Sequence, residues 1–142
     1  MGTRRTKPDS RLKAEDFRLL AEFRYLLRQF LTFSEAQAQE IGLSAQQHQA
    51  LLAIKGHDAG APVIGDLAHR LAIRHNSAVG LVNRLVEAGY VMRQEDPQDR
   101  RRATLALTRR GEGVLEKLTA AHRDELRRMA PLLKPLLAQL QH

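Results

Sequence analysis

The segment from Tyr90 to Thr108 restricts the fold of this chain more than any other part of its sequence. Residues 90–94 and 103–107 alternate between larger apolar side chains and small or polar ones, as half-buried strands do. The residues between them include Asp-Pro-Gln-Asp at 96–99, which is turn chemistry, followed by three consecutive arginines. The segment therefore predicts a two-stranded ribbon with a strongly basic tip.

Two short helical patterns come directly before this ribbon. Apolar residues repeat at helical spacing over residues 64–71, and residues 72–74 form a turn. Asn76 and Ser77 are suited to open the next helix, which Gly89 ends. Two short helices followed by a charged ribbon is the order of a winged helix-turn-helix, so we expect a mainly α fold with a small β-wing.

The N-terminal part of the chain predicts a long helix and then a shorter one. Asp9 or Ser10 can cap the long helix, and Gly42 stops it. Residues 44–47 fit the S-x-x-Q capping box of the second helix, and Gly56 supplies a left-handed residue at its end. The apolar stripe of the long helix is wide, and it comprises Phe17, Leu19, Leu20, Phe23, Leu26, Leu27, Phe30, Leu31 and Phe33. A helix that is apolar over so wide an arc must bury more than one side, most easily against a second protomer.

Two further helical patterns close the chain. Thr108 caps a helix that reaches about Met129, and Pro131 suits the first turn of a separate last helix. Pro135 predicts a kink or a later start for that last helix. Its apolar stripe consists of Leu132, Leu133, Leu136, Leu137 and Leu140.

Composition limits the partners that such a chain can have. The formal net charge is +7 and the sequence pI is about 10.5, which is typical of a nucleic-acid binder and also of an ordinary basic surface. Aromatic residues make up only 4%, which disfavours the stacking platforms that bind single strands. With no signal sequence and no apolar run of membrane-spanning length, the expected location is the cytoplasm.

The second short helix of the pair carries polar residues that can read DNA. Arginine pairs with guanine and asparagine with adenine in the major groove, while hydroxyl and imidazole groups at a helix start can bond phosphate. Ordinary solvated positions explain each of these residues taken singly, but less well in this motif order. The candidates are Arg74, His75, Asn76, Ser77, Gly80, Asn83 and Arg84.

The ribbon tip adds Asp99, Arg100, Arg101 and Arg102 to the candidates for DNA contact. Arginine is favoured in a narrow minor groove because the negative potential is enhanced there. Asp99 repels phosphate, but its carboxylate can hold a nearby arginine through a charge-assisted bond. A solvated turn is the alternative interpretation of the three arginines.

Arg109 and Arg110 lie in the first turn of the following helix, where the helix dipole disfavours cations. An external phosphate would remove that conflict, and a solvated position explains it equally well.

The chain resembles the MarR family of multiple antibiotic resistance regulators. The resemblance is carried by residues 66–71, 77–91, 96–101 and 107–111, above all by the Asp-Pro-x-Asp-Arg-Arg wing followed by Leu-Thr-x-x-Gly. It implies a sequence-specific regulator of transcription, usually a repressor, that binds a pseudo-palindromic double-stranded operator as a homodimer. It also implies a recognition helix in the major groove and a wing arginine in the minor groove, best matched here by Arg101 with Asp99 orienting it.

The resemblance also implies a division of the 142 residues as one MarR-type protomer. Residues 1–8 are expected to be a flexible basic arm. Residues 9–42 and 109–142 are expected to be dimerisation helices, and residues 44–108 the winged helix-turn-helix DNA-binding region.

Family members are commonly released from DNA by a small phenolic or aromatic ligand, bound between the dimerisation region and the winged helix. Phe23, Phe30 and His48 are the candidates for that contact, although core packing explains the two phenylalanines equally well. The chain has no cysteine, which excludes peroxide sensing through a thiol. Its histidines show no convincing metal-ligand spacing, so we expect neither a metal nor another cofactor.

Two other functions are open to a chain of this pattern. One is an architectural or partner-binding winged-helix protein that no ligand controls. The other is an enzyme, which we do not expect because there is no supported nucleophile arrangement, no H-E-x-x-H, and only a weak Gly-x-Gly at residues 111–113.

Overall fold

The structure is a computed structural model that describes residues 11–140. The arm expected at residues 1–8 and the helix cap expected at Asp9 or Ser10 lie outside this range. The elements are α1 (Ala14–Glu40), α2 (Ala45–Lys55), α3 (Ile64–Leu71), α4 (His75–Glu87), β1 (Val91–Glu95), β2 (Ala103–Leu107) and α5 (Arg109–Gln139).

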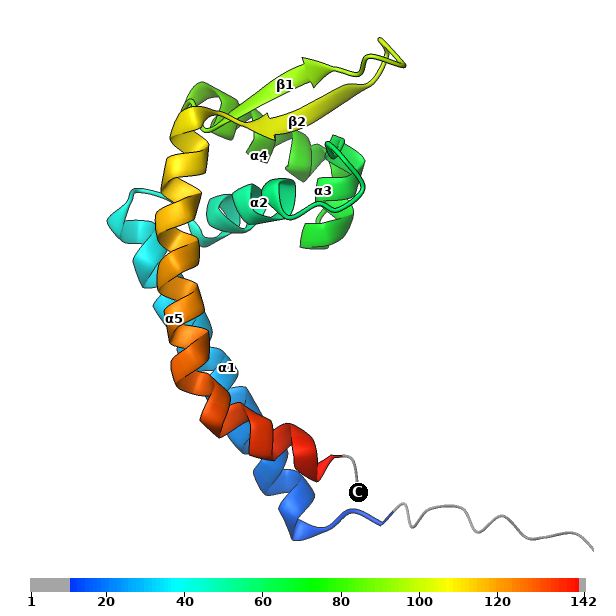
Figure 1. Ribbon diagram of the computed structural model, residues 1–142. Coiled ribbons are helices and arrows are strands. Elements are labelled where there is room, and N and C mark those ends of the chain that lie inside the picture. Colours follow the sequence, from blue (N-terminus) through cyan, green and yellow to red (C-terminus); the bar gives the residue numbers. More distant parts are fainter. Residues whose placement is uncertain (1–10, 141–142) are drawn as a thin grey trace, which may run out of the picture.

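The molecule has a globular head and a long helical stalk (Figure 1). The head contains α2, α3, α4 and the antiparallel ribbon of β1 and β2, while α1 and α5 run together as the stalk. The strands pair from Val91 opposite Leu107 to Glu95 opposite Ala103. The prediction of a mainly α fold with a small β-wing is therefore confirmed.

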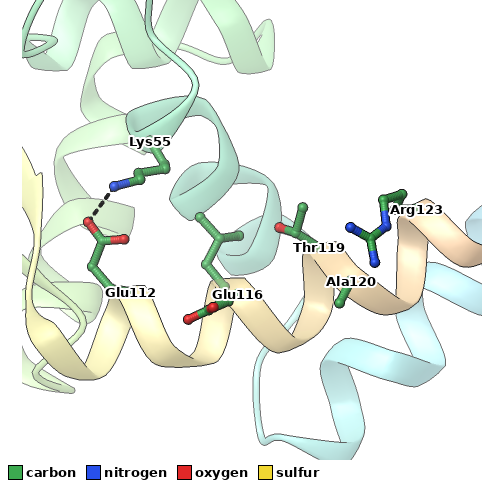
Figure 2. A pocket seen from close by; sticks show the side chains of 7 residues that line it. Lys55, Glu112, Glu116, Thr119, Ala120 and Arg123 are labelled. Atoms are coloured by element: carbon green, nitrogen blue, oxygen red, sulfur yellow. Dashed lines mark hydrogen bonds and ion pairs between the residues drawn. The ribbon is translucent and has the colours of Figure 1, made fainter.

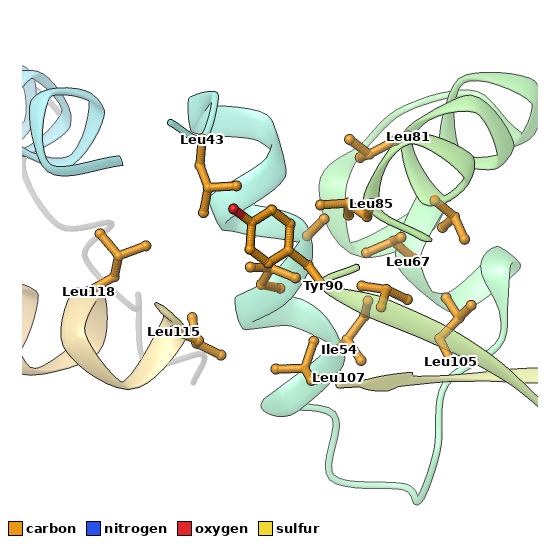
Figure 3. Close-up of a cluster of buried hydrophobic side chains, with 14 of the residues drawn as sticks. Leu43, Ile54, Leu67, Leu81, Leu85, Tyr90, Leu105, Leu107, Leu115 and Leu118 are labelled. Atoms are coloured by element: carbon orange, nitrogen blue, oxygen red, sulfur yellow. The ribbon is translucent and has the colours of Figure 1, made fainter. Parts of the chain in front are cut away.

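A cluster of buried leucines holds the head together (Figure 3). The cluster takes Leu51 from α2, Leu67 from α3, Leu85 from α4, Leu105 from β2 and Leu118 from α5, and each is almost fully buried. Because α5 contributes to the same core as α4 and the wing, the stalk and these elements of the head share one packed interior, in which small volume changes are felt.

Local signals in the sequence fix several element ends. Ser44 Oγ accepts a hydrogen bond from the backbone N–H of Gln47 at 3.0 Å, and the Gln47 side chain accepts one from Ser44 N–H at 3.0 Å, so the capping box is confirmed. Gly42 and Gly89 have φ of +86° and +82°, the left-handed region that glycine enters most easily. Both helix stops are confirmed.

The expected left-handed conformation of Gly56 is wrong. Gly56 has φ of −86° and donates its backbone N–H to the carbonyl of Leu52 at 2.9 Å, so it continues the α-helical hydrogen-bond pattern. A Cβ at Gly56 would lie 3.1 Å from that carbonyl oxygen. Glycine is used here for close approach rather than for handedness.

The start of α4 also differs from the prediction. The helix begins at His75 with Arg74 as its N-cap residue, so Asn76 and Ser77 lie inside the first turn and do not open it. The turn before it is as expected, because Ala72 takes φ of +54° and Ile73 N–H bonds the carbonyl of Ala68 at 3.0 Å. In the wing, β2 has the predicted bounds and β1 lies one residue later than expected.

The C-terminal segment is one continuous helix, which corrects the expected break before Pro131. Both Pro131 and Pro135 lie inside α5 on exposed positions. Each proline removes one backbone hydrogen bond, but water can satisfy the freed carbonyl on an exposed face, so the helix bends instead of ending. Figure 1 shows this bend in the last part of α5.

Candidate nucleic-acid interface and adjoining cavity

The polar residues predicted to read DNA lie together on the free side of α4 and at its start. Asn76, Gly80 and Asn83 follow one another at spacings of four and three, so they share a face of the helix. On the opposite face, Leu81 and Leu85 are buried in the core. Gly80 is half-buried, and the exposed members of the predicted set are Arg74, His75, Asn76, Ser77, Asn83 and Arg84.

Arg84 lies back along α4 toward Gly80. A Cβ at Gly80 would stand 3.5 Å from Nη1 of Arg84. A Cβ at that distance would be in ordinary van der Waals contact, so the guanidinium packs over Gly80 without needing the missing side chain. The arrangement brings a positive charge to the middle of the exposed face of α4.

Asn83 forms a contact that the sequence did not predict. Its Oδ1 accepts a hydrogen bond from Nη2 of Arg93, which lies on β1. Arg93 was not among the predicted site residues, although its strand position offered a signal. It lies two residues after the buried Val91, and residues at that spacing face the same side of a ribbon.

Hydrogen bonds within the wing loop fix the backbone that carries the three arginines. Arg102 N–H donates to the carbonyl of Asp99 at 3.0 Å, and Asp96 N–H donates to the carbonyl of Arg102 at 3.0 Å. Asp96 Oδ1 also accepts from Gln98 N–H at 2.9 Å. The side chains of Arg100, Arg101 and Arg102 are all exposed on this closed loop.

Asp99 contacts Arg101, but not in the way expected. Its Oδ1 accepts a hydrogen bond from the backbone N–H of Arg101 at 3.0 Å. Within residues 11–140 no ion pair joins Asp99 to an arginine side chain. The carboxylate therefore shapes the turn, and the guanidinium of Arg101 stays free to contact something else.

Arg110 connects the start of α5 to the end of α4. Its Nη1 donates to the carbonyl of Ala88 at 3.0 Å, and its guanidinium lies 4.6 Å from the ring centroid of Tyr90. A cation at the carbonyl end of α4 is favourable because the helix dipole is negative there. Arg110 is also exposed, in agreement with the solvated position, and these contacts explain its place in the fold without an external phosphate.

The Leu-Thr-x-x-Gly motif forms the other half of this joint. Thr108 Oγ1 donates to the carbonyl of Gly89 at 2.5 Å and accepts from Gly111 N–H at 3.1 Å, which confirms Thr108 as the cap of α5. A Cβ at Gly111 would overlap the carbonyl oxygen of Tyr90 and lie 3.1 Å from its carbonyl carbon. The motif thus lets α5 begin in direct contact with the segment between α4 and β1.

A cavity of about 650 Å³ opens between α1, α2 and α5, beneath the head. Two of the three predicted ligand contacts, Phe30 and His48, line it, whereas Phe23 does not. His122, which the sequence did not single out, lines it as well. The lining residues are Phe30, Leu31, Ser34, His48, Gln49, Leu52, Thr119, His122, Arg123, Leu126, Arg127 and Ala130.

Two histidines form the polar part of this mostly apolar wall. The rings of His48 and His122 lie with their centroids 4.8 Å apart. His122 Nδ1 donates to the carbonyl of Leu118 at 2.6 Å, and its Nε2 lies 2.7 Å from Ser34 Oγ. Within residues 11–140, His48 Nδ1 is the buried side-chain nitrogen or oxygen that has no hydrogen-bond partner.

Burial lowers the pKa of His48 below its ordinary value, and the nearby charge of His122 when protonated lowers it further. The neutral imidazole is therefore the favoured form at neutral pH. A neutral ring with a free nitrogen can accept or donate one hydrogen bond, depending on its tautomer. His48 thus lines the cavity with its ring, while its Nδ1 is buried behind the wall without a hydrogen-bond partner among the described residues.

A second hollow of about 540 Å³ runs along α5 nearer the wing (Figure 2). Lys55 of α2 and Glu112 of α5 form an ion pair at 2.8 Å at one end of it. Thr119 and Arg123 border both this hollow and the cavity. Because the ion pair is exposed, it contributes little to stability, but it marks where α2 meets α5.

The described part of the chain contains neither a candidate metal site nor a candidate membrane-spanning helix. Among residues 11–140, no three histidine or carboxylate side chains gather in a way that could hold a metal ion. In the same range, no helix combines the length and apolar character needed to cross a bilayer.

Comparison with known proteins agrees with this architecture. The profile of the MarR family matches residues 41–102, which run from the end of α1 to the tip of the wing. The chain is 35% identical over 83 residues to the uncharacterized HTH-type transcriptional regulator YcgE of Bacillus subtilis, covering 58% of this chain and 53% of YcgE. It is 26% identical over 96 residues to YfiV of the same organism, covering 68% of this chain and 59% of YfiV. These matches span little more than half of either relative.

Solved structures extend the likeness to the helical stalk. MepR of Staphylococcus aureus, a transcription regulator of the multidrug efflux pump MepA, matches with a TM-score of 0.70 at 19% identity, covering 83% of this chain and 95% of MepR. A MepR mutant bound to an oligodeoxyribonucleotide matches with a TM-score of 0.67 at 20% identity, covering 83% and 94%. At such identity the likeness concerns the fold. The matches to transcriptional regulators agree with the expectation that the chain is not an enzyme. Residues 41–102 thus match the MarR family, and the described chain has the MarR fold of winged helix-turn-helix regulators.

Proposed function

We propose that this protein is a sequence-specific double-stranded DNA-binding regulator that represses transcription. The observation that carries the proposal is the polar, basic face of α4, which lies beside a wing whose tip exposes three consecutive arginines. A helix and a wing side by side fit the major groove and the adjoining minor groove of one duplex. We propose a cytoplasmic location because the protein must reach the DNA that its cell transcribes.

In this proposal, α4 enters the major groove and Arg101 enters the minor groove. Asp99 supports this assignment because it fixes the backbone at Arg101 without engaging the guanidinium. Because the turn is already fixed, little backbone entropy is lost when the Arg101 guanidinium enters a narrow groove, where the potential is most negative. Arg100 and Arg102 then lie on either side of it, within reach of the phosphates.

The protein acts as a homodimer in this proposal, through the stalk. Large apolar side chains on α1 and α5 are left uncovered in the single chain, and monomeric proteins rarely expose a continuous surface of that kind. A second copy that packs on the stalk would bury them. They are Phe17, Leu20, Phe23, Tyr25, Leu27 and Leu31 on α1, and Leu126, Leu132 and Leu137 on α5. A dimer with two-fold symmetry presents two copies of α4 and therefore matches a pseudo-palindromic operator.

Control by a small aromatic ligand is supported by the cavity between head and stalk. Its wall is mostly apolar, it borders both α5 and α2, and it includes a few polar side chains, among them Ser34, Gln49 and Thr119. An aromatic molecule with one polar group fits that combination. Because α5 is joined to α4 through Arg110 and Thr108, a ligand that displaces α5 would also displace the recognition helix.

Selection of duplexes from a random pool tests DNA binding, and the enriched duplex then serves for measuring affinity. We expect enrichment of a two-fold symmetric sequence, and log affinity that falls steeply with log salt concentration. No enrichment, or a flat salt response, would contradict the proposal.

A thermal-shift screen of salicylate-like and other aromatic acids tests ligand control. A sensor requires a compound that both raises the melting temperature and weakens DNA binding. If no compound in a broad panel does both, the protein is the ligand-insensitive, architectural or partner-binding alternative.

A further inference from the structure

The notch between the recognition helix α4 and strand β1 of the wing contains an arginine that was not among the predicted DNA contacts. Arg93 lies on β1 opposite Leu105, so the two side chains share a face of the ribbon. Leu105 on that face is buried in the core, whereas Arg93 is exposed at its edge, where β1 passes over α4 (Figure 1). The guanidinium reaches across to α4 and donates to Oδ1 of Asn83.

Within the part of the chain that the structure describes, this guanidinium has no carboxylate partner. Within residues 11–140, none of the ion pairs includes Arg93, and its hydrogen bond to Asn83 uses only Nη2. A guanidinium has five N–H donors in a rigid fork, so most of them remain free. An uncharged amide is a weak partner for a full positive charge, which is left available for an external anion.

The geometry of a winged helix on DNA indicates which anion that is. If α4 lies in the major groove and the wing tip lies in the adjoining minor groove, one sugar–phosphate strand must separate them. That strand passes over the notch between α4 and β1, where Arg93 lies. Arginine binds phosphate well because its parallel N–H groups match two phosphate oxygens.

We infer that Arg93 is a further DNA-binding residue, which grips the phosphate strand between the two grooves, and that Asn83 is the positioning residue that holds it there. The inference rests on the proposed DNA-binding function and changes one part of it. Asn83 was predicted to read a base directly, but its carbonyl oxygen is already engaged by Arg93. A bidentate pair with adenine needs that same oxygen as the acceptor for adenine N6. The loss of Asn83 should therefore weaken phosphate binding without relaxing the base preference.

The test compares variants by fluorescence anisotropy on the duplex selected by the wild-type protein, over a range of KCl concentrations. Arg93→Gln removes the charge and should weaken binding at least about tenfold, since hydrogen bonds to charged groups are the strong ones. It should also reduce the slope of log affinity against log salt by about 0.9 for each protomer bound. Arg93→Lys keeps the charge and should restore most of the slope.

Lys117→Gln is the matched control. Lys117 is exposed on α5, away from α4 and the wing, and the substitution removes the same charge. It should leave the slope unchanged. A melting curve for each variant verifies that the fold is intact, and the salt slope is a quantity that a purely structural bond between wing and helix would not alter.

The role of Asn83 is tested by repeating the random-pool selection with Asn83→Ala. We expect the same base preference as the wild-type protein, and an Asn83→Ala/Arg93→Gln double variant that binds no more weakly than Arg93→Gln alone. A loss of preference at one base pair with Asn83→Ala would overturn the positioning role. A wild-type salt slope in Arg93→Gln would overturn the phosphate contact, while leaving DNA binding itself intact. If the wild-type protein selects no duplex at all, the proposed function fails, and this inference fails with it.

Discussion

The side-chain carboxylate of Asp99 accepts a hydrogen bond from the backbone N–H of Arg101 at 3.0 Å, and the turn at the wing tip closes around that bond. An acidic residue beside a tip that we propose to bind DNA thus has a structural purpose that does not need its charge. The oxygen matters because it fixes the path of the backbone. The negative charge opposes the approach of phosphate.

This relationship predicts opposite outcomes for two substitutions at one position. Asp99→Asn keeps a side-chain oxygen for the Arg101 N–H and removes the repulsive charge, so DNA affinity should stay the same or rise. Asp99→Ala removes the acceptor, and affinity should fall by up to about tenfold, since one such bond contributes about 1 kcal/mol. Anisotropy titrations at a single salt concentration measure both. If Asp99→Asn and Asp99→Ala weaken binding equally, the carboxylate acts through its charge. That result would favour the original expectation that Asp99 orients the Arg101 guanidinium.

Gly111 is expected to be intolerant of any side chain. Gly111→Ala places a Cβ in overlap with the carbonyl oxygen of Tyr90, and backbone atoms cannot move aside cheaply. We expect a loss of more than about 2 kcal/mol in the free energy of unfolding. Gly113→Ala is the control in the same helix, because a Cβ there meets nothing within 4 Å. That variant should be as stable as the wild-type protein or more stable by up to about 1 kcal/mol. Urea unfolding followed by circular dichroism measures both, and equal effects at the two glycines would disprove the close-packed joint.

His48 predicts a dependence of stability on pH. Burial lowers the pKa of His48 in the folded protein below its ordinary value of 6.5. The unfolded chain therefore binds a proton more readily than the folded one, so acid favours unfolding. This contribution is small above pH 6.5 and grows as the pH falls through that value toward the lower folded pKa.

His48→Gln removes the titrating group and should lose less melting temperature between pH 7 and pH 5 than the wild-type protein does. The measurement is a series of thermal melts over that pH range, analysed as the difference between the two proteins. Parallel curves would show that His48 is not held neutral by the fold.

The apolar surface of the stalk predicts how the protein assembles. Leu20 of α1 and Leu132 of α5 are 60% and 54% exposed in the single chain. A charge at either position should dissociate the dimer, because an unpaired charge would be buried when the second copy packs there. Sedimentation velocity of Leu20→Glu and Leu132→Glu should reveal monomers. Met92→Glu on the wing, where the native side chain is 39% exposed, adds the same charge outside the stalk and should remain dimeric. A wild-type protein that sediments as a monomer would refute the assembly outright.

Much of this fold follows from short-range signals in the sequence. The bounds of β2, the capping box at Ser44 and the left-handed Gly89 depend on residues within a few positions of one another, and these signals predicted them correctly. The continuity of α5 through Pro131 was not predictable in this way. It depends on the proline lying on an exposed face, which is a property of the folded chain.

In the candidate site too, short-range features were predicted and contacts between distant residues were not. The exposed face of α4 follows from helical periodicity, and all of its predicted residues lie on or beside that face. Their contact with DNA stays a prediction. Arg93 and His122 were missed because their contacts, to Asn83 and to His48, join residues on different elements. The sequence analysis singled out Arg110 but did not predict its contact with Ala88, which is 22 residues away in sequence. Local patterns carry no information on such pairs.

The most direct test of the central claim is a hydroxyl-radical footprint on the selected duplex, with the wild-type protein and with Arg101→Ala. The account predicts a two-fold symmetric pattern with half-sites about one helical turn apart, flanked by minor-groove protection that disappears in the variant. The variant should also bind more weakly by about 1–3 kcal/mol. A single asymmetric half-site, or a variant with the same footprint and affinity as the wild-type protein, would contradict the account.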